Sequence, residues 1–250
     1  MVLPMIRRWH DRQRAHMRRA LNHPAPSTWE NLGLWSDAEQ PYCEAARALA
    51  LRVAHQANLS ARDSVLDIGP GQGPDQNKLW TREFSIGHYY GWERDTPPPP
   101  DRRWDHVLAV DSAYFVPGLW PRLQALWPQV NACGTMTWTD LYLAQPLAGL
   151  SASARLRVTS TLAGIPWTHW RTREQWTRCL AQLPQSAVQF NDLTDDVLGG
   201  FVRHMAWRRN AKRPQQGLWI AHGTAALLRP LLDAGIIGYG LFQARRKDEP

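Results

Sequence analysis

Cysteine is scarce in this sequence, and long hydrophobic runs are absent. The three cysteines, Cys43, Cys133 and Cys179, lie far apart, with neither a CxxC pair nor a zinc-type Cys/His spacing. A disulfide framework and a cysteine-based zinc site are therefore excluded, and a reducing cytoplasm is the expected location. No apolar run reaches about 18 residues, which argues against a transmembrane helix. The first residues lack the apolar core of a secretory signal.

Acidic charge is nearly missing from the beginning of the chain. The net charge of the whole chain is +7, but the N-terminal stretch carries most of the excess. The apolar spacing predicts a helix over residues 5–21, and Asp11 is its one acid. Its arginines are Arg7, Arg8, Arg12, Arg14, Arg18 and Arg19. Because the rest of the chain is close to neutral, we expect no nucleic-acid partner. The helix fits a contact with anionic lipid at a membrane surface, a lid with a solvated basic face, or an interaction arm.

Apolar residues, in contrast, are plentiful enough for a folded core. They make up 44% of the 250 residues, and 14 residues are tryptophan. Charged residues make up only 20%, so global disorder is excluded. The length suits one large domain or two small ones.

Short apolar segments alternate with helical patterns from residue 61 onward. The predicted strands are SVLDIG, GHYYGWE, WDHVLAVD, GTMTWTDLYLA, SAVQFNDLT and, as an edge-type strand, GYGLFQARRK. This alternation predicts an α/β fold with a mainly parallel sheet. We expect a helical N-terminal lid over residues 1–60, a sheet domain over 61–250, and a helical cap at about 147–184.

The stretch VLDIGPGQG is the most informative motif. Asp67 ends a predicted strand, and Gly69, Gly71 and Gly73 follow at alternating positions. Glycine permits positive φ and lets a ligand lie against bare backbone, next to a helix N-terminus. The alternative is an ordinary tight strand–helix turn.

The spacing Asp-x-Gly-x-Gly-x-Gly resembles motif I of class I S-adenosylmethionine (SAM) methyltransferases. The segments ENLGLW, YCEAARALA, DQNKLW and WDHVLAVDSAYF also resemble the small-molecule branch of that family, related to coclaurine, tocopherol and cyclopropane-forming enzymes. The resemblance implies a Rossmann-like sheet of order 3-2-1-4-5-7-6. It also implies SAM as cofactor, bound by Asp67, Gly69, Gly71 and Gly73.

Further site residues follow from the strand ends. Glu93 ends the second strand, about 20 residues after the glycine turn, where an acid accepts hydrogen bonds from ribose hydroxyls. Asp111 ends the strand WDHVLAVD and is expected on the cofactor side. Tyr114, just after it, is expected as the catalytic group on the acceptor side. The resemblance places Trp35 and Tyr42 near the methionine end of the cofactor, although plain hydrophobic packing explains both equally well.

Three tryptophans in the expected cap region suggest what kind of acceptor the protein binds. Trp167, Trp170 and Trp176 fall in segments that cover the substrate in the resembled family. They either line an apolar acceptor site or pack the cap on the sheet. The scattered histidines form no Ser/His/Asp arrangement and no metal cluster.

One expected segment is missing. Only residues 94–103, with Pro97–Pro100, separate the second predicted strand from WDHVLAVD, whereas a strand-plus-helix unit needs about 30 residues. The third strand is therefore absent. Ten residues in extended polyproline form span about 31 Å. The bridge must cross two strand spacings, about 10 Å, and run back one strand length, roughly 17–20 Å, so an extended bridge is long enough. The usual adenine-binding acid is lost with the strand, unless Asp101 replaces it. The exposed edge would be covered by the bridge, by the N-terminal helix or by a second subunit in a homodimer.

The sequence thus favours a SAM-dependent methyltransferase of a small apolar, aromatic or lipid-like acceptor. The alternative is a non-catalytic protein with the same fold that serves as a binding or assembly subunit. A third interpretation is a peripheral membrane protein that binds through residues 5–21.

Overall fold

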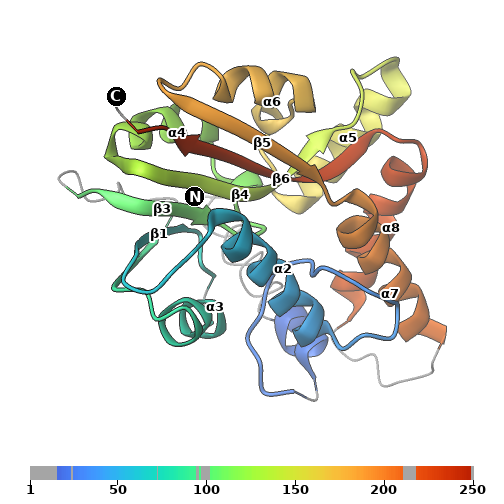
Figure 1. The fold of residues 1–250 in the computed structure, drawn as a ribbon. Helices are drawn as coiled ribbons and strands as arrows, with labels where there is room; N and C mark the ends of the chain where they lie inside the picture. The colour runs from blue at the N-terminus through green and yellow to red at the C-terminus, as the bar shows by residue number, and fades with distance from the viewer. Residues whose placement is uncertain are drawn as a thin grey trace, which may run out of the picture.

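A six-stranded sheet organises the molecule in the computed structural model (Figure 1). The structure describes residues 16–23, 25–71, 73–93, 96, 102–210 and 218–248. The strands are β1 (Ser64–Ile68), β2 (His88–Trp92), β3 (Trp104–Ala109), β4 (Val130–Leu143), β5 (Ser186–Asp192) and β6 (Ile237–Arg246). Their order is β2-β1-β3-β4-β6-β5.

The sheet confirms the predicted order with its third strand missing. β2, β1, β3 and β4 are parallel neighbours, and β6 runs antiparallel to both β4 and β5. No described residue pairs with the outer edge of β2, so a homodimer through that edge stays a prediction. The prediction of an edge position for the last strand is wrong. β6 lies between β4 and β5 and is buried over eight of its residues, because its chain returns into the sheet.

Helices cover both faces of the sheet, as Figure 1 shows. The α-helices are α2 (Tyr42–Ala57), α3 (Asp75–Lys78), α4 (Leu119–Leu126), α5 (Leu150–Ala163), α6 (Arg173–Leu180), α7 (Gly200–Asn210) and α8 (Trp219–Asp233). Two π-helical turns, η1 (Leu79–Glu83) and η5 (Asp195–Gly199), extend α3 and precede α7. Short 3₁₀ turns are η2 (Ala113–Phe115), η3 (Trp127–Gln129) and η4 (Trp167–His169). No helix in the described ranges is long and apolar enough to cross a membrane.

Two hydrophobic cores result, one on each face. The first joins α2, α7 and α8 with residues such as Val65, Leu108 and Leu241. The second joins α4 and α6 with Trp138, Phe242 and others. Strands buried on both faces read as continuous apolar runs, which is why β1 and β3 were recognisable from sequence.

The expected cap region divides between the two sides of the sheet. In α6, Trp176 is fully buried and packs against Trp138 and Phe242 in the second core. Packing, rather than an acceptor site, therefore accounts for Trp176. α5 instead contacts α8 on the other side. The boundaries at residues 60 and 61 and the cap limits stay predictions.

Of the bridge between β2 and β3 the structure describes only Thr96, Arg102 and Arg103, so its extended course stays a prediction. The Thr96 N–H donates to the Glu93 carbonyl at 3.0 Å, and the Trp92 indole N–H donates to the Thr96 carbonyl. Pro97–Pro100 and Asp101 lie outside the described residues, as does most of the N-terminal arginine stretch. The described residues 16–22 are helical.

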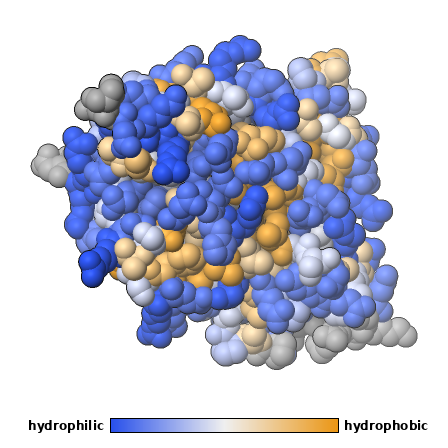
Figure 2. All heavy atoms as spheres, viewed as in Figure 1, coloured by the Kyte–Doolittle hydropathy of each residue, from blue (hydrophilic) through white to orange (hydrophobic). Residues whose placement is uncertain are grey.

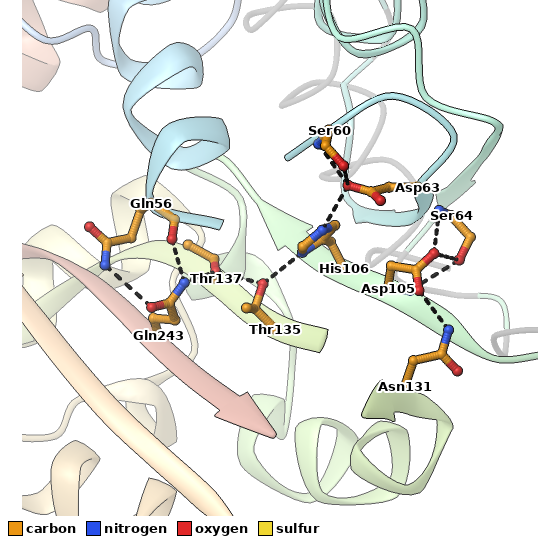
Figure 3. Close-up of polar contacts among 10 residues, drawn as sticks. All are labelled: Gln56, Ser60, Asp63, Ser64, Asp105, His106, Asn131, Thr135, Thr137 and Gln243. Carbon is orange, nitrogen blue, oxygen red and sulfur yellow. Dashed lines mark hydrogen bonds and ion pairs between the residues drawn. The ribbon is translucent and has the colours of Figure 1, made fainter. Parts of the chain in front are cut away.

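A polar ladder ties α2 to the amino ends of the parallel strands (Figure 3). The two ring nitrogens of His106 lie 2.9 Å from Thr135 Oγ1 and 3.0 Å from Asp63 Oδ2. Gln243 Nε2 donates to the Gln56 carbonyl at 2.6 Å. Burial lowers the pKa of His106. The amino ends of the parallel strands are therefore held together by hydrogen-bonded polar groups. A ligand of such a sheet is expected at the opposite, carboxyl ends of the strands.

Candidate active site

The glycine turn follows β1 at the carboxyl end of the sheet. Gly69 and Gly71 have φ values of +64° and +77°, which residues other than glycine rarely adopt. The Gly69 N–H donates to the Trp92 carbonyl at 2.9 Å. A Cβ added at Gly69 would come within 2.9 Å of Ser112 Cβ. Close approach and backbone conformation therefore both require glycine here.

Asp67 lies beneath this turn rather than in front of it. The side chain is fully buried, and its Oδ2 accepts hydrogen bonds from Gln76 Nε2 and Trp80 Nε1, both at 2.8 Å, and from the Tyr89 hydroxyl at 3.3 Å. Burial raises the pKa of Asp67 to about 6. Its Oδ1 is buried without a hydrogen-bond partner among the residues that the structure describes. Asp67 thus joins β1 to α3, η1 and β2 and fixes the turn above it.

The N-terminal loop packs directly on the glycines. A Cβ at Gly73 would lie 2.3 Å from the Thr28 side chain, and one at Gly71 would lie 3.2 Å from Glu30 Oε2. The Thr28 N–H also donates to Asp75 Oδ2 at 2.6 Å. Arg18 forms an ion pair with Glu30. One side of the turn is therefore covered by this chain's own loop.

Asp111 connects three segments at the end of β3. Its Oδ1 accepts hydrogen bonds from the hydroxyls of Tyr114 at 2.8 Å and Tyr239 at 2.7 Å. Its Oδ2 accepts one from the Leu32 N–H at 2.6 Å. Asp111 has a φ of +55° and its N–H donates to Thr139 Oγ1 at 2.8 Å. The carboxylate thus links the N-terminal loop to β3 and β6.

A cavity of about 240 Å³ lies between these groups, α5 and α8. Polar groups gather on the side of the glycine turn, where Glu30 and Asp111 are the two carboxylates and no lysine or arginine is among the described lining residues. The remaining wall is mostly apolar. It consists of Met17, Trp29, Leu32, Val110, Phe115, Leu141, Leu162, Ala163, Ile165, Trp219, Ile220, Thr224 and Leu228.

Most of the predicted site residues meet at this cavity. Gly69, Gly71, Gly73, Asp111 and Tyr114 line it. The roles assigned to them stay predictions, but their placement together follows from the turn and the end of β3 sharing one edge of the sheet.

Four predicted residues lie elsewhere, and one of them is Asp67 beneath the turn. Trp35 is buried, donates from its indole N–H to the Leu32 carbonyl at 2.8 Å, and stacks on His204 at 4.2 Å. Tyr42 donates its hydroxyl to the Asn31 carbonyl at 2.6 Å. Both hold the N-terminal loop in place from behind. Glu93 is exposed at the end of β2 and does not line the cavity.

Several residues of the site were missed from sequence. Thr28, Glu30 and Tyr239 reach it only through the tertiary fold. The buried pair His169 Nε2 and Asp140 Oδ1, 2.8 Å apart, lies beside Tyr114, whose ring centroid is 6.4 Å from that of His169. The motif ENLGLW did mark the loop, but its Glu30 and Asn31 line the cavity and Trp35 does not. No group of His, Cys, Asp or Glu in the described ranges could hold a metal ion.

Comparison with known proteins gives a fold. No protein-family model matches the chain, and no curated protein matches it in sequence. Solved structures do match. A mycolic acid cyclopropane synthase complexed with SAH and CTAB has a TM-score of 0.72 at 11% identity, over 94% of this chain and 95% of that chain. This chain has the fold of SAM-dependent methyltransferases.

Other structures with this fold differ in activity. Geranyl diphosphate C-methyltransferase from Streptomyces coelicolor A3(2) has a TM-score of 0.66 at 13% identity, over 94% of this chain and 98% of that chain. The cyclase SpnF has a TM-score of 0.62 at 16% identity, over 94% and 93%. The shared fold therefore does not determine the reaction, which depends on the residues of the site.

Proposed function

We propose that this protein is a SAM-dependent methyltransferase with an apolar or lipid-like acceptor. The observation that carries the proposal is the cavity itself. One wall is the turn of Gly69, Gly71 and Gly73 at the carboxyl end of β1, partly covered by Thr28 and Glu30, and the opposite wall is apolar. Solved structures with this fold include enzymes whose ligands are SAH and geranyl diphosphate.

The residues present fit the sulfonium end of such a cofactor. SAM carries a positive sulfonium and a positive ammonium, and the cavity has two lining carboxylates, Asp111 and Glu30, of which Glu30 is also paired with Arg18. A Cβ at Gly69 or Gly71 would narrow the space in which the cofactor would lie against the backbone. Glu93 lies outside the cavity at the end of β2, so it would accept hydrogen bonds from a ribose that extends beyond the cavity.

The chemistry at the site needs alignment more than covalent help. When bound, SAM would supply an electrophilic methyl group on a good leaving group. Tyr114 would orient the acceptor, because it lines the cavity and its hydroxyl is held in place by the hydrogen bond that it donates to Asp111 Oδ1. Phe115, Leu141 and Ile165 would hold an apolar acceptor and exclude water.

A non-catalytic binding or assembly protein is the second candidate. It is favoured by Thr28 and Glu30, which already lie on the glycine turn, and by the three hydrogen bonds that Asp111 accepts within the chain. If those contacts do not open, the backbone of the turn is never available to a nucleoside.

Calorimetry with S-adenosylhomocysteine, followed by transfer of a labelled methyl group from SAM to extracted lipids, tests the proposal. We expect saturable binding and label in an apolar product. Binding without transfer to any small apolar or lipid acceptor would favour the non-catalytic candidate. No binding at millimolar ligand by the folded protein would end the proposal.

A further inference from the structure

Helix α5 exposes an apolar stripe to solvent. Leu150, Ala154, Val158 and Leu162 follow one another at every fourth position and are all exposed, Leu150 by 92%, Val158 by 55% and Leu162 by 56%. Only Leu156, Thr159 and Ser160 of this helix are buried. At 100° per residue the buried residues lie opposite the stripe. The helix therefore turns its most apolar row away from the protein.

Positive charge flanks the stripe on both sides. By the same helical spacing, Arg155 lies beside one border and Arg157 beside the other. The helix has no acidic residue, and neither arginine belongs to an ion pair with a described residue. The Arg157 guanidinium lies 4.9 Å from the ring centroid of Trp167, which is 39% exposed. This combination of aliphatic, aromatic and basic side chains is typical of helices that lie in a membrane interface.

The stripe ends at the cavity. Leu162 lines the cavity, and so does Trp219 at the start of α8, which is 60% exposed. The cavity therefore opens beside the apolar row. Figure 2 shows apolar atoms at the surface near the corner where α5 begins in Figure 1, among largely hydrophilic surroundings.

We propose that the exposed stripe of α5, with Arg155, Arg157 and Trp219, docks this protein on the surface of an anionic lipid bilayer. The apolar row would enter the boundary between headgroups and acyl chains, and the two guanidinium groups would pair with headgroup phosphates. An acceptor could then pass from the bilayer to the cavity without crossing water. The docking itself does not depend on the proposed reaction.

Flotation of the full chain with vesicles tests this docking. The vesicles are phosphatidylcholine alone, or an equal mixture of phosphatidylcholine and phosphatidylglycerol. We expect binding to the anionic vesicles and little to the neutral ones. The double variant Arg155→Gln/Arg157→Gln should bind about 30-fold more weakly, from about 1 kcal/mol for each basic residue near an anionic surface. Val158→Glu should bind about tenfold more weakly, because an apolar contact is lost.

Matched control substitutions lie beside β2, at one edge of the sheet. Thr81→Glu and Arg82→Gln change exposed residues of η1, which contacts β2, and should bind as the original protein does. Equal binding by all the variants, or an equal loss in the controls, would overturn the proposal. So would equal binding to neutral vesicles. A self-association that Val158→Glu abolishes while vesicle binding persists would assign the stripe to a second copy of this chain instead.

Discussion

At Gly71, the proposed ligand and Glu30 of the N-terminal loop would occupy the same side of the backbone. Gly71→Ala would place a methyl group at a φ of +77° and 3.2 Å from Glu30 Oε2. We expect a loss of about 1 kcal/mol in the free energy of unfolding from the left-handed conformation, and at least tenfold weaker binding of S-adenosylhomocysteine by calorimetry.

Gly118→Ala is the matched control. Gly118 has a φ of +62°, but a Cβ there meets nothing within 4 Å. The same backbone strain should lower stability equally and leave ligand binding unchanged. Equal binding by the two variants would mean that no ligand approaches Gly71.

His204 should make stability depend on pH. Burial lowers its pKa from the ordinary value of 6.5 to about 4. The unfolded chain therefore takes up this proton at a higher pH than the folded chain does. The stability that His204 contributes is fully present above about pH 6.5 and is lost as the pH falls towards 4. At pH 5 the loss in the free energy of unfolding is about 2 kcal/mol.

The variant His204→Asn isolates that effect. Urea unfolding at pH 7 and pH 5 should show a fall in stability about 2 kcal/mol larger for the original protein than for the variant. Asp67 titrates in the same range with the opposite sign, because its folded pKa is raised, but it does so in both proteins. An identical fall in both would show that the ring is charged in the folded state.

Between elements, Asp111 is the connection that closes the N-terminal loop over the sheet. Asp111→Asn would leave one oxygen for three donors, from Leu32, Tyr114 and Tyr239. At about 1.5–3 kcal/mol for a hydrogen bond to a charged group, we expect a loss of about 3 kcal/mol in the free energy of unfolding. Hydrogen exchange of the Leu32 amide should become faster than that of the β3 amides.

Tyr114→Phe provides the comparison. It removes one donor and leaves the contact from the Leu32 N–H in place, so the loss should be about 1 kcal/mol with little change at the Leu32 amide. If both variants open the loop equally, the loop is held by packing of Trp29 and Trp35 and not by the carboxylate.

The same elements show which parts of the fold and the site could be predicted from the sequence. Strand–helix alternation and the Asp-x-Gly-x-Gly-x-Gly spacing are local signals, so the mainly parallel α/β fold and the glycine turn were predictable, whereas the strand order came from the family resemblance. The contact between Tyr239 and Asp111 joins residues 128 positions apart. Likewise, Thr28 meets Gly73 only because the loop folds back over the turn. Such contacts depend on the assembled sheet and leave no periodicity to detect.

For the whole molecule, a bound ligand should add to stability. S-adenosylhomocysteine at about 100 times its Kd would add about 2.7 kcal/mol, which corresponds to a rise in Tm of roughly 5–10 °C for a chain of this size. Differential scanning calorimetry measures this rise, and adenosine monophosphate serves as the control ligand. An equal rise with both compounds would indicate binding of adenine alone, without recognition of the sulfur end.

The short connection between β2 and β3 also bears on how the protein is made. β2, β1, β3 and β4 are parallel neighbours in the sheet and lie within residues 64–143, whereas β6, the other partner of β4, begins only at Ile237. Pairing of strands close in sequence costs little loop entropy, so this half should form first. The outer edge of β4 stays open until β6 has left the ribosome, and that interval is when the nascent chain most needs a chaperone.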